Sequence, residues 1–207
     1  MLRDRLGLEL DPEGLRQQVE ALGPLAPVIF VAALALRFVL LIPSALLLTA
    51  GGAIFGVVLG TLYGALGLTL MGLLQYLLVQ LAGAEALRAR VPERFAPALQ
   101  AARSWRGAAT LAVVSAYPVG PQTPVQLAAA LAGMGLVTFL LSVGGGAMLR
   151  AGLFSWFGSS LLEGERALLA AGLLGAVVAL PFLHPRSRRF VRGFFPAREG
   201  APQEPRA

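Results

Sequence analysis

The chain has 207 residues, of which 57% are hydrophobic and 14% charged, with 17 basic against 11 acidic residues and no cysteine. A soluble domain usually carries about 25% charged residues, so this composition argues against an ordinary soluble protein. Residues 38–84 and 107–149 contain no charge at all. Each run is about twice the roughly 20 residues that one spanning helix needs. We therefore predict an all-α polytopic membrane protein.

In chain order, residues 1–23 predict an amphipathic segment at the membrane surface, too charged to be a cleaved signal peptide. A membrane domain follows over residues 24–183, and a basic, largely disordered tail occupies residues 184–207. The apolar runs within the membrane domain predict helices at 25–42, 57–83, 137–158 and 167–183.

Residues 84–106 interrupt the hydrophobic sequence with five arginines against two glutamates. They predict an amphipathic segment on the membrane surface. Because basic residues concentrate on the cytoplasmic side of membranes, we expect this segment and the tail to lie in the cytoplasm. The turn with Glu163 and Glu165 is then outside, which gives a multi-pass protein of the cell membrane with both termini cytoplasmic.

Two apolar segments are broken by prolines. Residues 107–117 and 125–133 are each about half a bilayer long, and Pro118, Pro121 and Pro124 between them remove backbone donors. The pattern favours a re-entrant hairpin over a simple loop, and residues 41–56 look like a second, shorter one. Interrupted segments in two halves point to a transport site at their interface. The residues assigned to the tips are Pro43, Pro118, Gly120, Pro121, Pro124 and Gly133.

Glycines recur every four residues after the first break. On a continuous helix this spacing makes one narrow ridge that lets another backbone approach closely. Gln75 lies near the same line and would face a central cavity, although the ridge is equally consistent with helix packing alone. The predicted seam consists of Gly51, Gly52, Gly56, Gly60 and Gly64.

Arg150 lies inside the predicted helix 137–158, where an arginine normally faces the bundle interior or water. It is a candidate for binding a phosphate headgroup, as is Arg37. Snorkelling or capping of backbone carbonyls would explain Arg150 structurally, and snorkelling to a headgroup near the end of its helix would explain Arg37. Neutral hydrogen bonds would come from Gln122, Thr123 and Gln126 in the broken segment.

Enzymatic functions have little support. His184 is the only histidine, so neither a serine–histidine pair nor a histidine metal site is available, and no phosphate-cradling loop of the P-loop type occurs. We expect no catalysis, no metal and no cofactor. The basic tail is explained by attraction to anionic lipid rather than to nucleic acid.

The sequence resembles VTT-domain proteins of the DedA-like superfamily, also called SNARE-associated Golgi proteins, over residues 11–183. The resemblance rests on two series, Pro43, Gly51, Gly52, Phe55, Gly56, Gly60 and then Pro121, Pro124, Gly133. It implies an inverted repeat of re-entrant half-helix hairpins, each with a long transmembrane helix. It also implies lipid movement between leaflets, of polyprenyl phosphate in bacteria or of phospholipids in eukaryotic relatives.

Three features depart from the family pattern. Pro118 stands where an arginine is usual, Val79-Gln80 replaces a glycine–arginine pair, and residues 21–84 lack an acidic residue. Three functions stay open: a carrier of lipid or lipid-linked phosphate, a transporter of small ions or solutes, and a membrane scaffold. The expected partners are anionic phospholipid or polyprenyl phosphate, and a homo-oligomer is left open.

Overall fold

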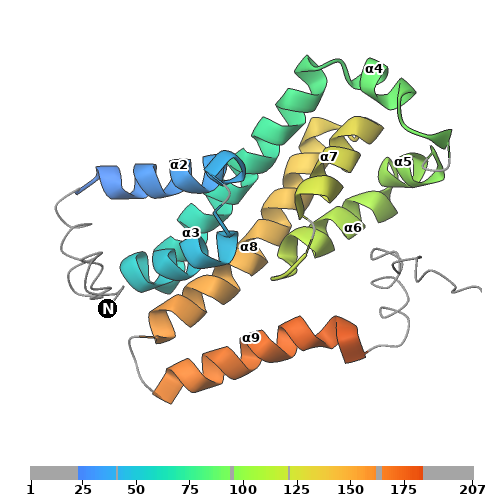
Figure 1. Cartoon of the computed structure of the whole chain (residues 1–207). Helices are drawn as coiled ribbons and strands as arrows, with labels where there is room; N and C mark the ends of the chain where they lie inside the picture. Colours follow the sequence, from blue (N-terminus) through green and yellow to red (C-terminus); the bar gives the residue numbers. More distant parts are fainter. Residues whose placement is uncertain (1–22, 41, 94–95, 121, 162–164, 184–207) are drawn as a thin grey trace, which may run out of the picture.

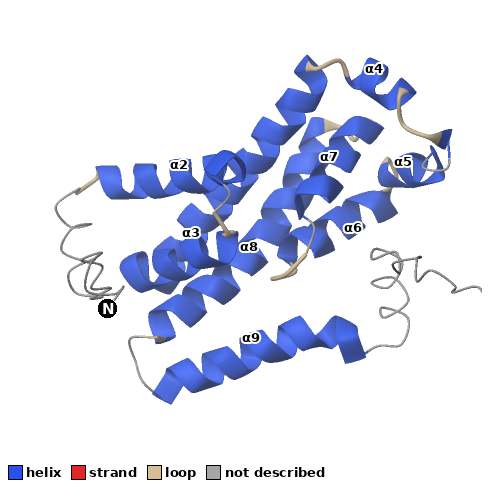
Figure 2. Cartoon of the chain, in the orientation of Figure 1, coloured by secondary structure: helices blue, strands red, loops and turns tan. Residues whose placement is uncertain are grey.

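The computed structural model describes residues 23–183 except 41, 94–95, 121 and 162–164 (Figure 1). All regular elements in this part are helices and none is a strand, which confirms the predicted all-α class (Figure 2). The predictions made for the N-terminal segment, the basic tail and Pro121 lie outside the described residues.

The first half consists of α2 (Leu25–Leu40) and α3 (Ser44–Leu81). Gly56 interrupts α3 with φ 75° and ψ −179°, a conformation that is essentially restricted to glycine. Beyond Gly56 the chain turns back. This is seen from Leu48, whose side chain lies 2.7 Å from where a Cβ on Gly64 would stand. These residues would be about 24 Å apart in one straight helix. α3 is therefore two antiparallel helices, 44–55 and 57–81.

The second half begins after the short helices α4 (Ala84–Ala89) and α5 (Ala96–Ala102). It contains α6 (Trp105–Ala116), α7 (Gln122–Ala132) and α8 (Leu136–Ser160). No helix runs through residues 117–121 as far as they are described, as the prolines predicted. The last described helix is α9 (Glu165–Leu183), which packs against α8.

The same order of elements occurs in both halves: a helix, a proline break, a short helix, a glycine with positive φ, and a long helix. In the first half the breaks are at Pro43 and Gly56, and the long helix is 57–81. In the second they are at Pro118 and Gly133, whose φ is 82°, and the long helix is α8. Gly133 was predicted at a hairpin tip, but it lies at the other end of α7 because it forms the turn into α8.

The two long helices pack against each other and divide the interior into two apolar clusters. Gly64 on the first long helix contacts Ala151 on α8, and the short helix 44–55 also packs on α8, with Gly52 against the Ser155 backbone and Thr49 against Gly158. One cluster joins the first half to α8 and contains Leu34, Leu48, Ala65, Leu68, Ala147, Ala151 and Phe154. The other belongs mainly to the second half and contains Val79, Ala84, Leu111, Ala129, Ala130, Met134, Phe139 and Val143.

Gly51, Gly52, Gly60 and Gly64 of the predicted glycine seam make close contacts and Gly56 makes none, and the geometry predicted for the seam was wrong. Gly52 precedes the reversal at Gly56 and Gly60 follows it, so they do not share one helix face. Instead the two sides of the hairpin meet, and a Cβ on Gly60 would stand 2.9 Å from the Gly51 carbonyl oxygen and 2.9 Å from Ser155 Oγ. Gly51 itself faces the ring of Phe30 on α2.

By length and composition, α3 and α8 are the two described helices that are long and apolar enough to cross a membrane. The straight part of α3, 57–81, extends about 37 Å, more than the roughly 30 Å of a hydrocarbon core. Of the other two predicted spans, α2 and α9 contain shorter apolar stretches, Leu25–Arg37 and Leu168–Ala179.

Candidate anion-binding cavity

The proline breaks of both halves meet at a cavity of about 360 Å³. Figure 1 shows the end of α2, the start of α3 and the loop between α6 and α7 converging near the middle of α8. The cavity is lined by Arg37, Pro43, Ser44, Ala45, Pro118, Val119, Gly120, Gln122, Thr123, Pro124 and Arg150.

Arg150 joins the two breaks from its position on α8. Its side chain is only 5% exposed, and its guanidinium donates from Nη1 to the Tyr117 carbonyl at 2.6 Å and from Nη2 to Ser44 Oγ at 2.7 Å. Tyr117 ends α6 in an extended conformation, so its carbonyl has left the helical hydrogen-bond pattern. The guanidinium also lies over the Phe154 ring, 5.8 Å from its centroid.

Arg37 reaches the cavity from the last turns of α2. Its Nη2 donates to Gln122 Oε1 at 3.4 Å, and Gln122 Nε2 donates to the Ser115 carbonyl at 2.9 Å. The amide of Gln122 therefore links the first half of the protein to the broken end of α6. Thr123 lies beside it at the start of α7 and also lines the cavity.

The charge at this site is entirely positive. Two guanidiniums line the cavity, and no carboxylate is among its described lining residues. Nε of Arg37 and Nε of Arg150 are both buried without a hydrogen-bond partner. Buried charges are costly unless they are paired, so this arrangement favours an anion with several oxygen acceptors.

The structure brings together several residues that were singled out from the sequence. Arg37, Gln122, Thr123 and Arg150 all line the cavity, together with the tip residues Pro43, Pro118, Gly120 and Pro124. Arg150 also donates to the backbone carbonyl of Tyr117, and carbonyl capping was the structural alternative predicted for it.

Two candidates lie elsewhere. Gln75 and Gln126 are each 2% exposed and are not among the cavity residues. Both amide atoms of Gln75 and Oε1 of Gln126 are buried without a hydrogen-bond partner in the described part of the chain. They lie within the helix packing and not at the hairpin tips.

Two direct partners of Arg150, Ser44 and Tyr117, were not predicted from the sequence. Tyr117 had a signal, because a residue before proline is pushed into an extended conformation and its carbonyl is then free to accept. Ser44 follows Pro43 as the first residue of a short helix, and nothing in the sequence connects it with a residue 106 positions away.

The cavity belongs to a segment that matches a known family. The profile of the VTT domain matches residues 42–160, which include both proline breaks, both long helices and Arg150. This chain belongs to the VTT domain family. The family is membrane-associated. No curated protein and no solved structure matches the chain.

Arg37 lies before the segment that matches the VTT domain. Within the described part of the VTT protein, no group of three or more histidine, aspartate or glutamate side chains is placed to hold a metal ion. The central cavity itself offers a ligand hydrogen-bond donors and positive charge.

Proposed function

We propose that this VTT protein moves phosphate-bearing lipids, anionic phospholipid or polyprenyl phosphate, between the leaflets of the cell membrane. The observation that carries this proposal is the cavity between the proline breaks, in which Arg37 and Arg150 face one space without a described carboxylate. A phosphate between the two guanidiniums would accept hydrogen bonds from those of their N–H groups that face the cavity.

The physical role of the cavity would be to lower a desolvation barrier. A lipid crosses slowly because its charged headgroup has to leave water for hydrocarbon. Donors fixed at membrane depth replace that water, and no covalent step is needed, so we propose a transport protein without enzymatic activity. Val119, 59% exposed, lies at the cavity and indicates an opening through which acyl chains could stay in the bilayer.

We further infer that transport is passive or driven by the membrane potential. The sequence has no acidic residue between Glu20 and Glu85 or between Glu93 and Glu163. A proton relay through a buried carboxylate is therefore unavailable in the membrane helices of both halves. Arginine keeps its charge, so the cavity would attract an anion without a proton cycle.

In this proposal the two hairpins are re-entrant and enter from opposite faces. Phe30 on α2 stacks against Phe55 with ring centroids 5.4 Å apart, which places the early part of α2 beside the turn at Gly56. α6 instead begins directly after residues 84–106, at the far end of the long helix 57–81 (Figure 1). The hairpins therefore approach the cavity from opposite ends of the molecule.

We propose a topology with residues 84–106 in the cytoplasm, as their arginines predict. The start of α2 then lies on the outer side, so a cytoplasmic N-terminus does not follow from this arrangement, and residues 1–22 lie outside the described part. Leu161 is 49% exposed at the outer end of α8. A Leu161→Cys variant should react with an impermeant thiol reagent from outside, and reaction from the cytoplasmic side alone would reverse the topology.

The transport proposal is tested with purified protein in liposomes that carry fluorescent phosphatidylglycerol or a fluorescent polyprenyl phosphate. Wild type should accelerate transbilayer movement of at least one of them. Arg150→Gln and Arg37→Gln should each slow it about 10- to 100-fold, the equivalent of one charge-assisted hydrogen-bond partner. Arg90→Gln, outside the cavity, is the matched control.

Each variant is first checked for folding by thermal unfolding, because Arg150 also holds Tyr117 and Ser44. Movement no faster than in protein-free liposomes for both lipids would reject the lipid proposal. The same cavity would accept a free anion, so phosphate uptake is measured in parallel, and uptake without lipid movement would favour the solute transporter. A scaffold would show neither activity.

A further inference from the structure

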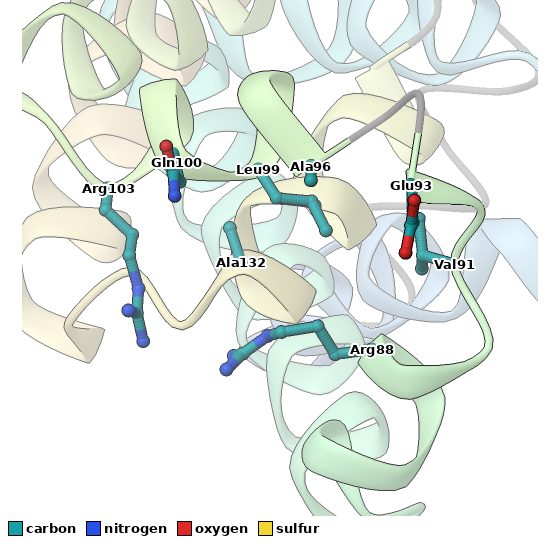
Figure 3. A pocket seen from close by; sticks show the side chains of 8 residues that line it. All are labelled: Arg88, Val91, Glu93, Ala96, Leu99, Gln100, Arg103 and Ala132. Carbon is teal, nitrogen blue, oxygen red and sulfur yellow. The ribbon is translucent and has the colours of Figure 1, made fainter.

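A second group of arginines lies outside the central cavity, at the other end of α7. A pocket of about 320 Å³ lies between residues 84–106, which we call the cationic segment, and this end of α7 (Figure 3). It is lined by Arg88, Val91, Glu93, Ala96, Leu99, Gln100, Arg103 and Ala132.

Arg88 has a structural role at this pocket. Its Nε and Nη2 donate to the Leu131 carbonyl at 3.0 and 2.8 Å. The last carbonyls of a helix lack partners within the helix, so Arg88 completes the C-terminal end of α7. This contact fixes the position of one guanidinium beside Gly133.

Arg103 comes to the same place from the other side of the pocket. A Cβ on Gly133 would stand 2.9 Å from Nη2 of Arg88 and 2.9 Å from Nη2 of Arg103, so these two nitrogen atoms lie within twice that distance of each other. Arg103 is exposed and donates no hydrogen bond to a described residue. Because Gly133 has no side chain, the space between the two guanidiniums stays open.

Two like charges that converge in this way repel each other unless an anion lies between them. Glu93 is the acidic residue among the pocket's described lining, and Figure 3 shows it across the pocket from both guanidiniums. Arginine pairs suit phosphate in particular, since each guanidinium presents parallel N–H groups to two oxygens. The described lining of the pocket therefore places no negative group between the two guanidiniums.

The surroundings identify the source of that group as a lipid. The pocket lies beyond the end of α3, where Leu81 is 84% exposed, and Trp105 nearby in sequence is 75% exposed. The guanidinium of Arg106 lies 5.7 Å from the Trp105 ring centroid. Exposed tryptophan and arginine beside an apolar helix end are typical of the headgroup region of a membrane.

We propose that Arg88 and Arg103 bind the phosphate of an anionic phospholipid at the membrane surface, in a site separate from the central cavity. Arg88 is held in place by α7, and Arg103 closes on the headgroup. Val91 and Leu99 in the same pocket offer apolar contact to the glycerol and the first carbons of the chains. The site would fasten the cationic segment to the membrane and stabilise the end of α7.

The test measures phosphatidic acid binding to the full-length protein in neutral detergent, from the rise in its unfolding temperature with lipid concentration. Arg103→Gln should bind about tenfold more weakly, because one charge-assisted partner is lost. Arg106→Gln removes the same charge from the same segment outside the pocket, and it should bind as wild type does. Without lipid, Arg103→Gln should unfold at the wild-type temperature, whereas Arg88→Gln should unfold earlier.

The same titrations are repeated in an Arg150→Gln background, so that lipid in the central cavity is separated from lipid at this site. Loss of binding on Arg103→Gln in that background supports the surface site whether or not the protein transports lipid. Equal binding by Arg103→Gln and Arg106→Gln would overturn it. An equal rise in unfolding temperature with inorganic phosphate alone would overturn the assignment to a lipid.

Discussion

The two proline-broken halves share one means of stabilisation and differ in a second. In the first half the short helix 44–55 packs through glycine, with Gly52 against the Ser155 backbone and Gly158 against the Thr49 carbonyl. In the second half Gly146 packs in the same way against the Ala112 carbonyl of α6. The broken end of α6 is also satisfied by side chains, because Gln122 and Arg150 donate to the Ser115 and Tyr117 carbonyls. Close packing therefore occurs at both breaks, and side-chain donors to freed carbonyls are added at the second.

This difference explains where the polar groups of the protein gather. Hydrogen bonding at the second break requires buried donors, and those donors line the cavity. Arg150 serves both halves, since Ser44 at the first break accepts its other hydrogen bond. The candidate site is therefore a property of the junction between the halves. Neither hairpin would form it alone.

The largest effect is expected from breaking the glycine packing of the first half. Gly158→Val places side-chain atoms onto the Thr49 carbonyl and should lower the free energy of unfolding by about 3 kcal/mol or more. Gly145→Val on the same helix is the control, because a Cβ there meets nothing within 4 Å. Thermal unfolding in detergent compares the two variants. Equal losses would mean that this contact does not hold the first break in place.

The next largest effect is expected at Gly56, where the backbone conformation can be tested separately from side-chain packing. A Cβ on Gly56 also meets nothing within 4 Å, but its φ of 75° with ψ −179° is closed to other residues. Gly56→Ala should therefore destabilise by about 1–3 kcal/mol. Gly172→Ala, in open space on helix α9, should instead be neutral or stabilising by up to about 1 kcal/mol. Unfolding temperatures that rise in both variants would show that Gly56 is not strained.

The sequence allowed prediction of some of these features and not of others, for physical reasons. Proline removes a backbone donor wherever it stands, so the end of α6 at Ala116 was predictable. Glycine at intervals of four fits a continuous packing ridge equally well, so the seam was drawn through Gly56 although the long helix was predicted to begin at residue 57. Charge within or beside a predicted membrane helix identified Arg37 and Arg150, but their partners depend on contacts between distant parts of the chain.

Gln75 and Gln126 are two further residues whose position the sequence did not predict correctly. Both are polar residues in apolar helices, and that pattern alone predicts a place in the cavity. The structure buries them in the helix packing instead. The rotation of each helix about its axis decides between these outcomes, and apolar helices with few polar residues define that rotation poorly.

The smallest effect is expected from a proline, and it tests which residue makes the second break. Pro124 is the third residue of α7, where a backbone N–H has no partner within the helix, so its ring costs no hydrogen bond. Pro124→Ala should change the free energy of unfolding by less than about 0.5 kcal/mol.

Pro118 follows the extended Tyr117 and is buried at the cavity, so Pro118→Ala should reduce lipid movement several-fold by allowing α6 to continue. Both are measured in the liposome assay and by thermal unfolding. If Pro124→Ala reduced transport as strongly as Pro118→Ala, the break would depend on the start of α7 and not on the end of α6.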